Sequence, residues 1–181
     1  LALLQSLPMV EKVFWYDFKD DGLTREYNEH NFGVVRHQRF NCAPKPAIVA
    51  MSVFVRVTAG AKPVGLRQND ALFTLPYRRP DGSELLVLWT TAGETKVRFS
   101  GRGVAGCDLM GNPLAAGPPF TAGVNPIYIT GRDLAAQAKS LRYKGGIYAG
   151  KAHHPLSGHQ RRARGQGHQL SEPARRRRRS R

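Results

Sequence analysis

The residues best suited to chemistry lie near the start of the chain, where Trp15 and Asp17 sit in the run Val13-Phe14-Trp15-Tyr16-Asp17-Phe18. This run passes directly into Lys19-Asp20-Asp21-Gly22. An apolar, β-branched and aromatic run that ends in acids and a glycine is typical of a strand buried on both faces that leads into a polar loop. A tryptophan and a carboxylate at the exit of such a strand are well placed to meet a ligand. A core strand with a solvated turn explains the same residues, because a tryptophan in an apolar run usually packs.

The length and the composition set broad limits. With 181 residues, of which 41% are hydrophobic, the chain has room for one domain or two small ones. No run of about 18 apolar residues is present, so the sequence predicts no membrane span. Cys42 and Cys107 are far apart, with no histidine at metal-ligand spacing, so we expect neither a metal site nor a cofactor.

The first of three parts, residues 1–60, mixes the strand pattern with helical patterns. The start of the chain, Leu1 to Leu7, reads as the end of an apolar helix stopped at Pro8. The polar stretch from Asp20 to Asn31 contains several turn-forming residues and predicts a loop. After Pro46, apolar residues recur at helical spacing as far as Val57, and Gly60 suits a helix stop, which predicts a helix over this stretch.

The second part, residues 63–134, predicts a small antiparallel β-sandwich. Short β-type runs alternate with turn signals, as in known sandwiches. The strongest hairpin signal is Pro80-Asp81-Gly82-Ser83, between two apolar runs. The predicted strands are Ala71–Tyr77, Glu84–Trp89, Thr95–Ser100, Ala105–Leu109, Phe120–Thr121 and Asn125–Ile129.

The third part, residues 145–181, is a basic tail for which we expect disorder, because it has too few apolar residues to form a core. From Lys151 onward it carries +9 of the net charge of +15, so the rest of the chain is only mildly basic. An arginine run can bind nucleic acid by neutralising phosphates. From Lys151 onward no Phe, Trp or Tyr is interleaved for base stacking, which disfavours that function.

The order of motifs in the first part resembles the end of a clan A glycoside hydrolase, as in families 39 and 5. The resemblance rests on three stretches: Val10-Glu11-Lys12-Val13-Phe14-Trp15-Tyr16-Asp17-Phe18, Glu29-His30-Asn31-Phe32-Gly33-Val34-Val35 and Lys45-Pro46-Ala47. The second part is similar to the β-sandwich that follows the barrel in many such enzymes. Its matching stretches are Leu85 to Trp89, Asp108 to Asn112 and Pro126-Ile127-Tyr128-Ile129, so the resemblance covers roughly Leu1 to Leu134.

This resemblance implies that residues 1–60 are the last β/α unit of a (β/α)8 barrel: the end of the seventh helix, the eighth strand and the eighth helix. Active sites of this fold lie at the C-terminal ends of the strands. Trp15 would offer its indole to the apolar face of a sugar, and Asp17 would accept hydrogen bonds from sugar hydroxyls. A packed barrel-top residue is the alternative for Trp15, and a loop cap or ion pair is the alternative for Asp17. Glu29, His30 and Asn31 are weaker candidates, since turn formation explains them too.

The resemblance also implies that the catalytic residues lie outside this chain. Retaining glycosidases use two carboxylates about 5 Å apart. In this clan they come from the fourth and seventh strands, which would precede Leu1, so we assign no catalytic residue. We therefore expect a piece of a secreted or periplasmic glycosidase that is inert alone and needs the missing barrel to fold residues 1–60. Two alternatives remain: an independent carbohydrate-binding or structural β-sandwich, and a nucleic-acid-binding protein that acts through its tail.

Overall fold

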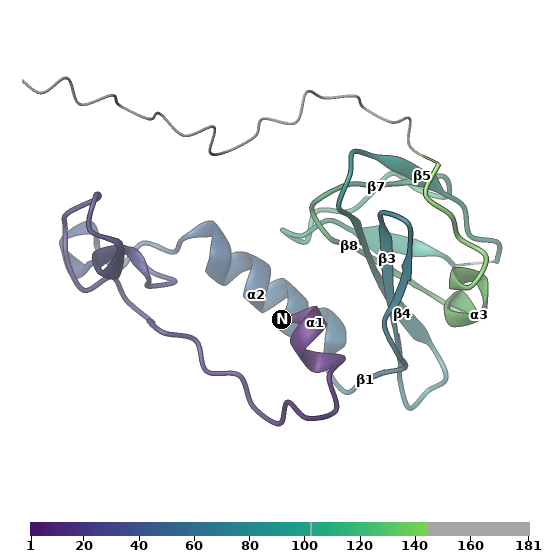
Figure 1. The fold of residues 1–181 in the computed structure, drawn as a ribbon, viewed down its shortest axis with the longest axis horizontal. Coiled ribbons are helices and arrows are strands. Elements are labelled where there is room, and N and C mark those ends of the chain that lie inside the picture. The colour runs from purple at the N-terminus through teal and green to yellow at the C-terminus, as the bar shows by residue number, and fades with distance from the viewer. Residues whose placement is uncertain (102, 145–181) are drawn as a thin grey trace, which may run out of the picture. The chain divides into compact units, whose positions relative to one another are not determined.

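The computed structural model describes residues 1–101 and 103–144 (Figure 1). The predicted basic tail, residues 145–181, lies outside this range. Among the described residues, no helix has the length and apolar character needed to cross a bilayer. The elements in chain order are α1 Ala2–Gln5, the short 3-10 helices η1 Asn28–Asn31 and η2 Gln38–Phe40, α2 Pro46–Thr58, β1 Lys62–Pro63, β2 Arg67–Asn69, β3 Leu72–Arg78, β4 Glu84–Thr90, β5 Thr95–Val97, β6 Ala105–Cys107, β7 Phe120–Ala122, β8 Ile127–Gly131 and α3 Leu134–Ala138.

All strand pairs of the named sheets are antiparallel, as predicted for the second part of the chain. The larger sheet has the order β1-β3-β4-β8-β6, with β2 also paired to β3, and the smaller sheet pairs β5 with β7. The predicted hairpin is β3–β4. Its turn is fixed by the Asp81 carboxylate, which accepts hydrogen bonds from the Ser83 amide at 2.9 Å and from the Ser83 hydroxyl at 2.7 Å. Gly82 takes a positive φ of 77° there, a conformation that favours glycine.

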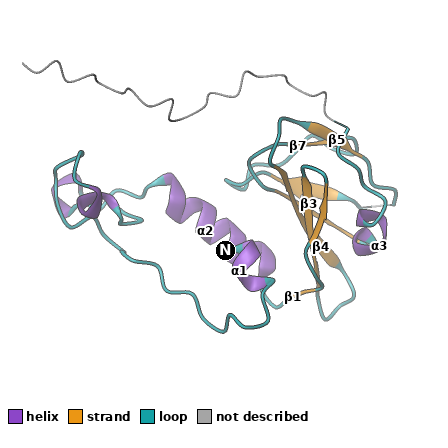
Figure 2. Ribbon diagram, viewed as in Figure 1, coloured by secondary structure: helices purple, strands orange, loops and turns teal. Residues whose placement is uncertain are grey.

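Strand β4 is buried on both faces, which explains its nearly continuous apolar sequence. Leu86 and Leu88 face a core that includes residues of β5, β7 and α3. Leu85 and Val87 face the opposite way, into a second core that includes residues of α2. The larger sheet is therefore covered on one side by the smaller sheet and α3, and on the other side by α2 (Figure 2).

Helix α2 confirms the helix predicted after Pro46. Pro46 occupies the first turn, where its missing N–H costs no hydrogen bond. Val53 and Phe54 are buried against the sheet, and Gly60 follows the helix with a φ of 67°. The sequence did not reveal that this helix covers the second face of the sheet.

The strand predicted for Val13–Phe18 is wrong for the described structure, because these residues form no strand (Figure 2). The pairing nearby is a single parallel bridge between Lys19 and Val35. A strand buried on both faces needs hydrogen-bonded neighbours and covering layers. The described residues therefore give the predicted eighth strand no paired neighbours along Val13–Phe18, although its apolar pattern suggested them.

Candidate functional site

The segment Val13–Phe18, hereafter the aromatic segment, presents its rings to solvent. The exposed fraction is 54% for Trp15, 87% for Phe14 and 70% for Tyr16. Large aromatic side chains usually bury most of their surface, so a contiguous exposed run is a candidate contact surface for a ligand or for another part of the protein. In the described structure the Trp15 ring is therefore accessible to solvent.

Asp17 is held by the backbone of the neighbouring loop. Its amide donates to the Phe32 carbonyl at 3.4 Å, and its own carbonyl accepts from the Val34 amide at 3.1 Å. Its carboxylate accepts a hydrogen bond from the Phe18 amide. This local hydrogen bond is of the loop-capping kind, and it fixes the Asp17 carboxylate within the aromatic segment.

A partly buried ion pair that sequence reasoning missed holds the loop in place. The side chain of Asp20 accepts from Lys45 Nζ at 2.5 Å and from the Gly33 amide at 3.0 Å. Lys45 Nζ also donates to the Asn31 carbonyl at 2.8 Å. A Cβ atom on Gly33 would lie 2.2 Å from the Asp20 amide nitrogen, so this approach requires glycine. We call these contacts the Asp20–Lys45 brace, which joins the end of the aromatic segment to the start of α2.

The brace could not be found from spacing, because its two charges lie 25 positions apart. The sequence features at the brace are Lys45 before Pro46 and Gly33 among apolar residues. Both features are common in proteins, so neither predicts an ion pair. Because Asp20 is only 6% exposed, its charge depends on Lys45 and on the Gly33 amide for compensation.

The weaker candidates on η1 make their side-chain hydrogen bonds within their own loop. Glu29 accepts from the Tyr27 hydroxyl at 2.8 Å, and the His30 ring accepts from the Thr24 amide at 3.3 Å. The Asn31 side chain donates to three carbonyls, of which the shortest contact is 2.8 Å to Tyr27. These contacts are the turn-forming role that competed with ligand binding in the sequence analysis. None of these side-chain hydrogen bonds is made with Trp15 or Asp17.

Acidic groups lie beside the rings of the aromatic segment. The Tyr16 hydroxyl donates to Asp21 at 3.4 Å, and the Tyr16 ring meets the edge of Phe32 at a centroid distance of 6.3 Å. The charge of Asp21, with smaller effects of burial and of Asp17, raises the pKa of Tyr16 above its ordinary value. Flat apolar rings with carboxylates beside them can bind a ligand that has an apolar face and a hydroxyl-bearing edge, as a pyranose does.

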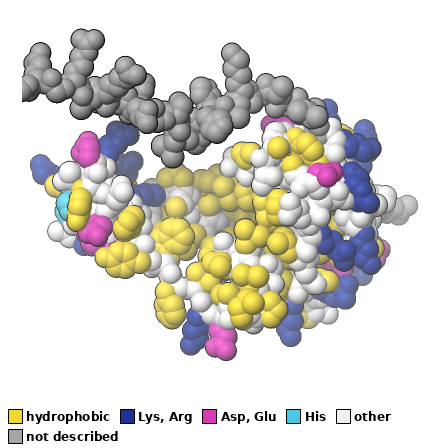
Figure 3. All heavy atoms as spheres, viewed as in Figure 1, with side chains coloured by type: hydrophobic (Ala, Val, Ile, Leu, Met, Phe, Trp, Pro, Cys, Tyr) yellow, Lys and Arg dark blue, Asp and Glu magenta, His cyan; other side chains and the backbone are white. Residues whose placement is uncertain are grey.

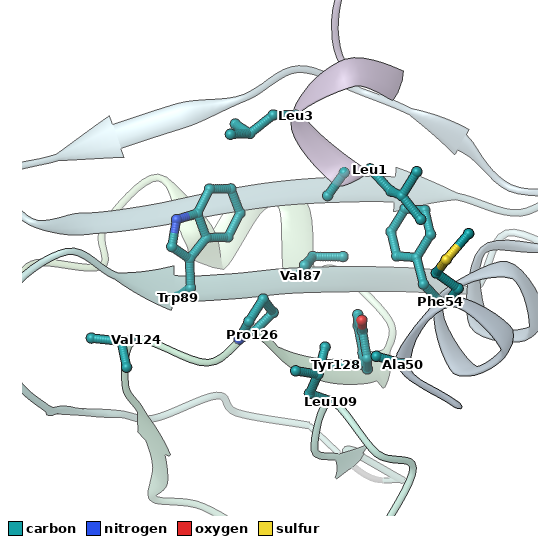
Figure 4. Close-up of a pocket in the computed structure, with 12 residues that line it drawn as sticks. Leu1, Leu3, Ala50, Phe54, Val87, Trp89, Leu109, Val124, Pro126 and Tyr128 are labelled. Atoms are coloured by element: carbon teal, nitrogen blue, oxygen red, sulfur yellow. The ribbon is translucent and has the colours of Figure 1, made fainter. Parts of the chain in front are cut away.

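A separate apolar hollow of about 370 Å³ lies between α1, α2 and the sheet (Figure 4). Trp89 projects into it from β4, and Tyr128 lies at its side. The Trp89 ring stacks on Phe73 at a centroid distance of 5.1 Å and an interplanar angle of 12°. Burial is the main cause that raises the pKa of Tyr128 to about 12. The hollow offers few polar groups to orient a ligand, so the aromatic segment remains the better candidate.

Among the described residues, no group of three or more His, Cys, Asp or Glu side chains could hold a metal ion.

Comparison with known proteins gives a likeness to a solved structure. No family model matches the sequence, and no curated protein matches it either. A solved structure of a family 39 glycoside hydrolase from the gut symbiont Bacteroides cellulosilyticus WH2 is similar, with a TM-score of 0.53 and 23% sequence identity. The match covers 64% of this chain and 25% of that chain, so this chain corresponds to about a quarter of the hydrolase. At this identity the likeness concerns the fold, and the chain shares its fold with part of a family 39 glycoside hydrolase.

Proposed function

We propose that this chain is the C-terminal part of a glycoside hydrolase that acts on O-glycosidic bonds of an oligosaccharide or polysaccharide. The observation that carries the proposal is the exposed aromatic segment, in which the Asp17 carboxylate is fixed by the Phe18 amide. The fold likeness to part of a family 39 glycoside hydrolase supports the choice of ligand class. In this proposal Trp15 forms an apolar platform for one sugar ring.

In this proposal the catalytic residues precede Leu1. A retaining glycosidase needs a nucleophile and an acid/base carboxylate about 5 Å apart. In this proposal both belong to earlier barrel strands, and residues 1–60 supply the last β/α unit. The apolar run Val13–Phe18 would then gain the strand neighbours that its sequence pattern calls for. This chain alone would bind sugar weakly and would hydrolyse none.

The test uses the longer polypeptide encoded by the same gene, assayed on aryl glycosides and on oligosaccharides. We expect hydrolysis, and we expect Trp15→Ala to raise KM about two- to thirteenfold, because a stacked ring contributes about 0.5–1.5 kcal/mol. Phe40→Ala is the matched control, since Phe40 is an aromatic residue of η2 that is 51% exposed and lies outside the aromatic segment. We expect its kinetics to equal those of the wild type.

Two results contradict the proposal. A longer polypeptide that folds but cleaves no glycoside removes the assigned reaction. A Trp15→Ala enzyme with unchanged KM on every substrate removes the platform role of Trp15 while leaving the reaction class standing.

A further inference from the structure

A surface rich in lysine and arginine lies on the sheet part of the molecule, away from the aromatic segment. It consists of two adjoining hollows of about 760 and 310 Å³, which share Leu141 and Arg142. Figure 3 shows dark blue side chains gathered on the side where α3 lies. We call this region the basic surface, and its cationic side chains are Arg67, Lys96, Arg98, Lys139, Arg142 and Lys144.

Strand β5 and its continuation present two of these charges by simple alternation. Thr95, Val97 and Phe99 are buried, and the last two belong to the core between the sheets. Lys96 and Arg98 stand between them and are exposed. Because successive side chains of an extended chain point to opposite sides, both cations face solvent on the same side. The core therefore fixes where these two charges lie.

The segment after α3 is tied down across the basic surface. The Leu141 carbonyl accepts from the Asn69 side chain at 3.0 Å, and the Lys144 amide donates to the Thr95 hydroxyl at 2.9 Å. The Tyr143 hydroxyl donates to the Ala92 carbonyl. These contacts hold Arg142 and Lys144 beside the charges of β5, so the arrangement exists before any ligand binds.

The charges of the basic surface are poorly neutralised by the rest of the described chain. The ion pairs among the described residues are Lys45 with Asp20 and Arg78 with Glu84. Neither pair includes a member of the basic surface. Glu94 is the acid that lines its larger hollow. Like charges held close together repel one another, and an anionic ligand relieves that repulsion.

We propose that the basic surface binds an acidic polysaccharide, one that carries carboxylate groups along its chain. Lysine and arginine pair with carboxylates, and arginine does so with two parallel hydrogen bonds. The hydroxyls of Thr121 and Ser140 line the same hollow and suit sugar hydroxyls. The residues that line the two hollows include no aromatic ring on which a nucleic-acid base could stack, which favours a polysaccharide over a nucleic acid. The proposal does not depend on glycosidase activity, because it concerns a different surface.

The test measures binding of polygalacturonate to the full chain by titration calorimetry, at low and at physiological ionic strength. We expect binding that weakens with salt, and none to fully methyl-esterified polygalacturonate, which lacks the charges. Lys96→Glu with Arg98→Glu should weaken binding at least about tenfold, because two attractions become repulsions. The control Arg36→Glu with Arg39→Glu makes the same change in net charge at exposed sites outside the basic surface, and should change binding less than about twofold.

Circular dichroism must show wild-type folding of each variant. If the glutamate pair fails to fold, Lys96→Gln with Arg98→Gln replaces it, with a smaller loss of affinity expected. Absence of polygalacturonate binding overturns the proposal. So does an equal loss in both charge-reversed variants, which would assign binding to net charge alone. Tighter binding of a single-stranded oligonucleotide that is lost in the Lys96/Arg98 variant also overturns it, and assigns the surface to nucleic acid.

Discussion

Replacing Phe54 by alanine tests whether α2 is an integral layer of the sheet core. Phe54 is 5% exposed and packs in the core on the α2 side of the sheet, with its ring centroid 6.4 Å from that of Tyr128. Truncating a buried phenylalanine costs about 3–5 kcal/mol. Because the helix is open to solvent on its other side, the cavity can partly collapse, and we expect the lower end, about 3 kcal/mol. For a folded region of this size the midpoint of thermal unfolding should fall by about 10 °C.

The assay is urea unfolding of the full chain, followed by far-ultraviolet circular dichroism. Val55→Ala is the matched control, since Val55 follows Phe54 on the same helix and is 63% exposed. We expect the control to change the free energy of unfolding by less than about 0.5 kcal/mol. The slope of the free energy of unfolding against urea concentration should be unchanged in both variants, so that the unfolding midpoints report stability directly. The reasoning is refuted if Phe54→Ala lies within about 1 kcal/mol of the wild type, or if Val55→Ala costs as much.

Three further predictions concern the brace and the buried tyrosines. Asp20→Asn should destabilise the loop by about 1.5–3 kcal/mol, because Lys45 loses its charged partner, and faster amide hydrogen exchange there, with the sheet unaffected, would show it. Gly33→Ala should disorder the same loop, since its Cβ would overlap the Asp20 backbone; limited proteolysis at a rate equal to that of the wild type would contradict this. The pKa values of Tyr77 and Tyr128 are raised from 10.0 to about 12, mainly by burial, so the folded state keeps these phenols protonated. The free energy of unfolding should stay constant up to about pH 10 and fall from there to about pH 12, and a stability that is flat across that interval in alkaline urea titrations would refute the assignment.

Local signals in the sequence were enough to predict the hairpin and α2. The turn residues Asp81 and Gly82 act within a few positions of one another, so their chemistry is visible in the sequence. Pro46 and Gly60 likewise mark the two ends of α2 through local backbone preferences. These elements appear within one or two residues of the predicted boundaries.

The predicted strand at Val13–Phe18 failed because a strand depends on partners that a local pattern cannot supply. β-branched and aromatic residues show that a segment fits a pleated, buried surface. The described residues pair with its end only through the Lys19–Val35 bridge and a few backbone contacts to Phe32 and Val34. The segment therefore keeps its apolar composition and exposes it.

The candidate site was predictable in part. The sequence drew attention to Trp15, which the structure leaves accessible, and to Asp17, which it fixes beside the rings. The sequence could not show that Asp20 and Lys45 hold the loop, because contacts across 25 positions leave no periodic trace. It also could not separate ligand binding from turn formation for Asn31, whose amide is bonded to three carbonyls of its own loop.

The double-sided burial of β4 has a practical consequence for anyone who trims this protein. A shortened chain that begins at Pro63 would uncover Leu85, Val87 and Tyr128 together, on a face that now has almost no contact with water. Such a face, next to unpaired strand edges, favours self-association in solution. Any shortened version of this protein should therefore keep α2 together with the larger sheet.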